Sequence, residues 1–197
     1  MTAPLNRLGT LSLILSLAGI AGLALAKWLE NEALMPYAFL LILFGCAGFA
    51  LQTVFRREEY VSLGDEGIGA YLYGFQAVAS GLSWLALTMM ALIPLLVRLV
   101  LGAERLKAFI HGYPGFFLVL GGFWLASHSL GVIFGQALSN AGHYASSRME
   151  SGVMMLNGLA EKAISCILAV SGTAVAVWGG WSLAADKGPV ELLLGLI

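Results

Sequence analysis

Hydrophobic residues follow one another in five long stretches that contain no charged side chain. The stretches cover residues 8–26, 35–55, 77–97, 116–138 and 163–184. Each has 19 to 23 residues, and a helix of about 20 residues, rising about 1.5 Å per residue, crosses a hydrocarbon core of about 30 Å. The pattern predicts an all-α integral membrane protein, a bundle of about five transmembrane helices with short loops.

The third stretch is preceded by further uncharged residues, so we expect its helix to cover residues 70–97. Pro94 lies near the far end of this helix, where a kink or a helix end is expected. The segment before the fifth stretch and the tail after Pro189 are predicted to form amphipathic, interfacial segments. The first stretch ends in Ala24-Leu25-Ala26, which resembles a signal cleavage site. The stretch is longer than a signal core, which favours a retained signal anchor.

Composition agrees with membrane residence. Hydrophobic residues make up 59% of the chain and charged residues 11%, with a formal net charge of −1. No connection between stretches is long enough for a soluble domain, so residues 1–197 are expected to form a single transmembrane domain. Because no cluster of Lys and Arg occurs, nucleic-acid binding is not expected.

Small residues recur at helical spacing in the fourth and fifth stretches. Gly131 and Gly135 form a GxxxG motif, and Gly172, Ala176 and Gly180 repeat at every fourth residue. Membrane helices associate through close van der Waals packing, which small residues allow. These residues are therefore predicted to form helix-packing interfaces, either within the chain or at a subunit contact.

His128 is the candidate for chemistry, because it is the ionisable residue placed well inside a stretch. It could be a packed core residue, a ligand of haem or another cofactor, or a proton-handling group. Successive histidines, His111, His128 and His143, are separated by about 22–26 Å along a helix, which excludes two of them on one iron within a chain. A haem would need a partner's ligand, or Met89 or Met90, which we expect at a similar depth.

A polar stripe of Asn157, Glu161 and Ser165 leads into the fifth stretch and could line a polar entrance. Signatures of zinc hydrolases, serine hydrolases, phosphate-binding loops and CxxC redox motifs are missing, so no catalytic residue and no metal site are predicted. Catalytic activity of the chain itself is therefore not expected.

The sequence favours a non-enzymatic small subunit, scaffold or assembly factor of a larger membrane complex, with the lipid bilayer and other membrane subunits as partners. A haem- or quinone-associated redox subunit using His128 is the first alternative, and a homo-oligomeric transporter or channel is the second. We expect a bacterial inner membrane location with the N-terminus inside. The two sides carry five Lys or Arg each, so the positive-inside rule itself does not decide the orientation.

Overall fold

The computed structural model describes residues 7–62, 69–135 and 148–194, and only the backbone of 60–62, 69–71, 148–158 and 192–194. In chain order the elements are α1 Arg7–Trp28, the 3₁₀ helix η1 Glu32–Leu34, α2 Met35–Arg56, β1 Glu58–Ser62, β2 Gly69–Tyr73, α3 Phe75–Leu101, α4 Ala103–Gly112, α5 Pro114–Phe134, α6 Arg148–Ala185 and α7 Pro189–Leu194. Helices dominate, and the two strands form one short hairpin.

Five helices, α1, α2 (extended by η1), α3, α5 and α6, are long and apolar enough to cross a membrane. Their most apolar windows have mean hydropathies between 1.7 and 2.2. The prediction of an all-α membrane fold with about five spans is confirmed.

The third span begins later than the expected residue 70. Residues 69–73 form strand β2, and α3 starts at Phe75. Gly74, at φ +61°, separates the two elements in a conformation that glycine adopts readily. Tyr71 and Tyr73 favour a strand, and counting charges alone does not distinguish an uncharged strand from the start of a helix.

Helix α3 continues through Pro94 to Leu101, so the proline does not end it. The predicted helix before the fifth span is continuous with that span, because α6 runs for 38 residues from Arg148 to Ala185. The last part of the expected fourth span, residues 136–138, lies outside the described residues.

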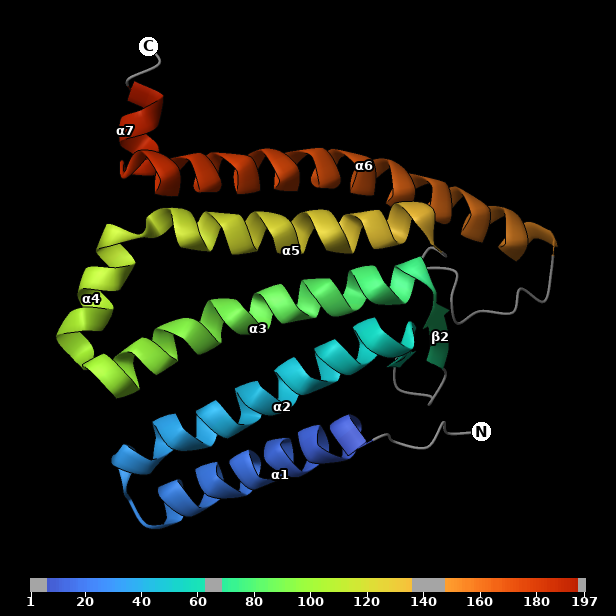
Figure 1. Cartoon of the computed structure of the whole chain (residues 1–197). Helices are drawn as coiled ribbons and strands as arrows, with labels where there is room; N and C mark the ends of the chain where they lie inside the picture. The colour runs from blue at the N-terminus through green and yellow to red at the C-terminus, as the bar shows by residue number, and fades with distance from the viewer. Residues whose placement is uncertain (1–6, 63–68, 136–147, 195–197) are drawn as a thin grey trace.

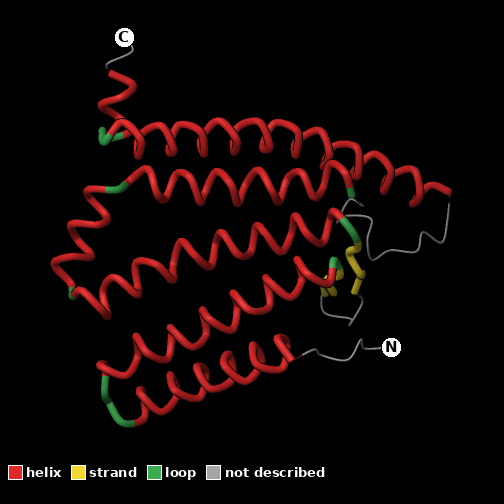
Figure 2. The backbone as a smooth tube through the Cα atoms, viewed as in Figure 1, coloured by secondary structure: helices red, strands yellow, loops and turns green. Residues whose placement is uncertain are grey.

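The five spans lie in a row in the order α1, α2, α3, α5, α6 (Figure 1). Each span packs on the next one in this order, and within the described part of the chain no broad contact joins spans that are not neighbours in it. Figure 2 shows the hairpin beside one set of helix ends, while α4 and α7 lie beside the opposite ends of the spans. Each inner helix therefore contacts two neighbours, and much of its remaining surface is uncovered by the chain.

Glycines bring α5 and α6 together most closely. A Cβ added at Gly172 would lie 2.7 Å from the backbone nitrogen of Ala126, and one at Gly179 would lie 2.7 Å from the carbonyl oxygen of Gly115. A Cβ at Gly122 would meet the backbone of Gly172. Since these atoms are backbone, the two helices pack at a distance that only glycine permits at these positions.

Candidate functional site

The β1–β2 hairpin presents one carboxyl group towards the helices. Glu59 is paired with Leu72 across the strands, and Glu58 with Tyr73. Directly paired residues lie on the same face of a two-stranded sheet, and successive residues alternate between its faces. Leu72 is only 4% exposed and Tyr73 is 60% exposed, so Glu59 belongs to the inner face and Glu58 to the outer one.

The carboxyl group of Glu59 contacts α3 and is within reach of a charge on α5. The hydroxyl of Ser80 on α3 donates a hydrogen bond to it, and His128 on α5 is near enough for its charge to act on it. The Oε2 atom is buried and has no hydrogen-bond partner among the described residues. Burial raises the pKa of Glu59 above its ordinary 4.5, while the Ser80 bond and the His128 charge act in the opposite direction. This cluster is the most chemically distinctive place among the described residues.

His128 lies six residues before the end of α5, nearer the hairpin end of the span than its far end. Its side chain is exposed from the chain. Ionisable side chains inside a membrane span are costly unless they have a polar partner. Glu59 supplies a nearby opposite charge when both groups are ionised.

The register of α3 and α5 bears on the haem alternative. The rings of Phe75 and Phe134 are 5.7 Å apart, and a Cβ on Gly131 would lie 3.2 Å from that of Ala79. These contacts place His128 about level with Leu82. Met89 is seven residues further along α3, or about 10 Å at 1.5 Å per residue.

Met89 and Met90 therefore do not lie at the depth of His128, so the methionine partner considered from the sequence is unsuited to it. His111 lies on α4, which is beside the helix ends farther from the hairpin (Figure 1). His143 is outside the described residues. No group of three or more His, Cys, Asp or Glu side chains that could hold a metal occurs among the residues that the structure describes. A haem at His128 stays a prediction that would need a ligand from a partner, and a quinone at His128 stays a prediction as well.

An apolar groove of about 330 Å³ crosses α3, α5 and α6. It is lined by Phe75, Val78, Ala79, Leu82, Phe123, Ala126, Ser127, Leu130 and Thr173. The hydroxyls of Ser127 and Thr173 donate to carbonyls of their own helices. The groove therefore offers mainly hydrocarbon contacts. His128 does not line it, since His128 and Leu130 are two residues apart and point about 200° from each other around the helix.

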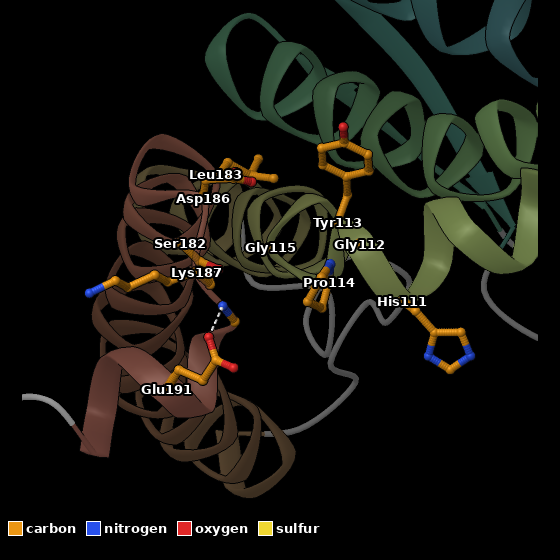
Figure 3. A pocket seen from close by; sticks show the side chains of 11 residues that line it. His111, Gly112, Tyr113, Pro114, Gly115, Ser182, Leu183, Asp186, Lys187 and Glu191 are labelled. Atoms are coloured by element: carbon orange, nitrogen blue, oxygen red, sulfur yellow. Dashed lines mark hydrogen bonds between the residues drawn. The ribbon is translucent and has the colours of Figure 1, made fainter.

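A second, polar cavity of about 160 Å³ lies between the α4–α5 turn and the end of α6 (Figure 3), beside the helix ends that are farther from the hairpin. Within it the Ser182 hydroxyl donates to the Lys187 carbonyl at 2.6 Å, and Glu191 accepts from the Gly188 N–H at 3.2 Å. In Figure 3 the His111 ring and the Lys187 ammonium point away from each other and from Gly115. The charged groups of this cavity therefore do not converge on one ligand.

The residues predicted to form helix-packing interfaces lie in different environments. Gly131 and Gly135 lie against Ala79 and Gln76 of α3. A Cβ at Gly122 of α5 would meet Gly172 and Ala176, whereas a Cβ at Gly180 would meet nothing within 4 Å. The α5–α6 contact thus continues through Gly179 instead of Gly180.

The predicted polar entrance is described in part. Ser165 is buried and Glu161 is half-buried, while the side chain of Asn157 lies outside the described residues. They remain a prediction for a polar entrance.

The sequence pattern did not single out Glu59 or Ser80 as site residues. A signal was present, because Glu59 and Leu72 lie in short segments with strand-forming Tyr and Val residues on either side of a glycine-rich turn. The pairing register, which decides which carboxyl faces inward, is not visible in the sequence.

Comparison with protein-family models, with curated proteins and with solved structures yields no match for this chain. The function proposed below therefore rests on the structure of the chain.

Proposed function

We propose that the chain is a non-enzymatic subunit, scaffold or assembly factor of a larger membrane complex. The observation that supports this proposal is the row of spans, in which, over the described residues, each span makes broad contacts with its neighbours in the row and with no other span. Between 17% and 33% of the most apolar window of each span is buried within the chain. Most of the spanning surface is therefore available to lipid or to helices of other subunits.

Two glycines support contacts with other helices. A Cβ added at Gly121 of α5 or at Gly180 of α6 would meet no atom of the chain within 4 Å. Small residues are enriched where membrane helices approach one another closely. Gly121 and Gly180 are positions where a helix from another subunit could approach the backbone.

Crosslinking in native membranes, followed by native mass spectrometry, tests the proposal. The wild-type chain is expected in particles that contain additional chains, either other subunits or further copies. Gly121→Leu and Gly180→Leu should fold normally, since the added side chains meet open space, and should reduce assembly. Particles that contain one copy and no partner, from membranes in which the gene is expressed natively, would contradict the proposal.

Gly122→Leu is the matched control for Gly121→Leu. It places the same side chain one residue away, against the backbone of α6, and should impair folding of the chain itself. Gly131 and Gly135 are unsuitable for the assembly test, because both contact α3 within the chain. Loss of assembly only in variants that also misfold would count against a partner at Gly121 or Gly180.

For location, we propose a bacterial inner membrane with the N-terminus inside. The hairpin and the start of α6 would then lie on the cytoplasmic side, since both lie beside the same helix ends as the start of α1 (Figure 1). Reporter fusions in the β1–β2 turn and at the C-terminus should report opposite sides. A cytoplasmic signal from the C-terminal fusion alone would reverse the orientation.

A further inference from the structure

The hairpin depends on its inner face for stability. It has only two strands, and a two-stranded hairpin is marginal in water on its own. Among the described side chains, Leu72 and Glu59 form a cross-strand pair on the inner face. How well these two side chains fit against α3 therefore contributes to keeping the hairpin on the helices.

Leu72 has one form, which is apolar and stable when buried. Glu59 has two forms, protonated and ionised, and burying the ionised form costs more free energy than burying the protonated one. An ionised carboxylate loses hydration on burial, and here Oε2 gains no protein donor among the described residues in exchange. The protonated carboxyl carries no charge, so it is cheaper to keep in the same place. The docked hairpin should thus favour the protonated form.

Three further charged residues of the described part of the chain lie next to Glu59 in sequence. Glu58 is on the outer face of β1, Arg57 at the end of α2 is exposed, and Arg56 beside it is half-buried. The first turns of α3 contribute the uncharged Gln76 and Ser80. Besides burial, the Ser80 hydrogen bond and the charge of His128 act on the pKa of the Glu59 carboxyl.

We infer that Glu59 and Ser80, within reach of the His128 charge, form a proton-binding site at the membrane boundary, which holds the hairpin against α3 when the carboxyl is protonated and loosens it when the carboxyl is ionised. The ligand is a proton from the aqueous phase beside the hairpin. The site needs no partner chain, so its test is independent of the proposed assembly.

The direction of the pH dependence follows from burial. The pKa of Glu59 is raised in the docked state above 4.5, its value in an undocked chain. The stabilisation from protonation is therefore complete below 4.5 and is lost as pH rises through the raised pKa. A protonated His128 opposes this effect by favouring the carboxylate.

Hydrogen exchange of the hairpin amides, measured on the full chain in lipid nanodiscs between pH 5 and 9, tests the site. Glu59→Gln is the key variant, because glutamine resembles the protonated carboxyl and stays neutral at every pH. Comparing the variant with the wild type at each pH cancels the intrinsic pH dependence of exchange. The wild-type hairpin is expected to exchange severalfold faster than the variant at high pH and to approach it at low pH.

Glu58→Gln is the control, since it removes the neighbouring charge on the outer face. It should follow the wild type at every pH. His128→Gln should move the wild-type transition to higher pH, because a charge that favours the carboxylate is lost. Equal exchange in wild type and Glu59→Gln throughout, or an equal response in Glu58→Gln, overturns the site, and an unmoved transition in His128→Gln overturns the role of His128.

Discussion

Helix α5 packs on α6 through one side and on α3 through the other, and the two interfaces differ in kind. Towards α6, a Cβ on Gly115, Gly122, Gly172 or Gly179 would meet backbone atoms at once. Towards α3, a Cβ on Gly131 would first meet the side chain of Ala79. The α3 side also has the apolar groove and the cluster at Glu59. Tight glycine packing supplies rigidity, and the looser interface leaves space where polar groups and ligands can be placed.

Gly122→Ala should break the tighter interface and give the largest effect. The added methyl would lie 2.5 Å from the Gly172 carbonyl oxygen, so the backbones must separate. We expect a loss of about 3 kcal/mol in the free energy of unfolding, at the upper end of overpacking costs. Unfolding in mixed micelles, followed by tryptophan fluorescence, measures it.

Gly131→Ala should lower the free energy of unfolding by less than a third of that amount. Its methyl would lie 3.2 Å from the methyl side chain of Ala79, which can shift slightly. We expect at most about 1 kcal/mol, in the lower part of the overpacking range. The same unfolding assay compares the two variants directly. Equal losses at Gly122 and Gly131 would remove the distinction between the two interfaces.

Glu59→Gln should change stability by an amount that depends on pH. The pKa of Glu59 is raised by burial, so the wild type loses stability as pH rises through that pKa and the variant does not. Melting curves at pH 4 and at pH 8 should show a gain for the variant at pH 8 only. A gain of the same size at both values would attribute the effect to packing instead of charge.

Thr173→Val should have the smallest effect. The Thr173 hydroxyl lines the groove but donates to Ala169 of its own helix at 2.8 Å, so an isosteric valine removes no contact between helices. We expect a change within about 0.5 kcal/mol, as is usual away from a specific feature. A larger loss would show that this hydroxyl supports the α3–α5–α6 groove.

The sequence was sufficient for the spans and insufficient for their arrangement. Charge-free stretches reflect the cost of charge in hydrocarbon, so they located all five helices to within a few residues. The hairpin was missed because residues 70–74 lack charge, and charge does not distinguish a strand from a helix. Gly172 and Gly180 belong to the same four-residue repeat in the sequence, yet of these two only Gly172 contacts α5. The crossing of two helices decides which glycines meet.

The sequence predicted one part of the candidate site, His128, and not the other part, Glu59 and Ser80. His128 stood out because an ionisable residue in a span is costly, which is a local property of the sequence. Glu59 and Ser80 join it through strand register and through the turn from β2 into α3, which bring residues from three elements together. Such long-range placement leaves no periodic signal along the chain.

The row of spans leaves both sides of the layer open to partners. The native cysteines test this arrangement directly. Cys46 on α2 and Cys166 on α6 are both exposed and unpaired, and α3 and α5 lie between their helices. Three helix spacings of about 8–10 Å predict about 24–30 Å between the helix axes. Spin labels on the two cysteines, measured by pulsed EPR in nanodiscs diluted with unlabelled protein, should give a main distance in this range. A main distance below about 15 Å, close to one helix spacing, would mean that α2 and α6 are neighbours in a closed bundle and would contradict the row.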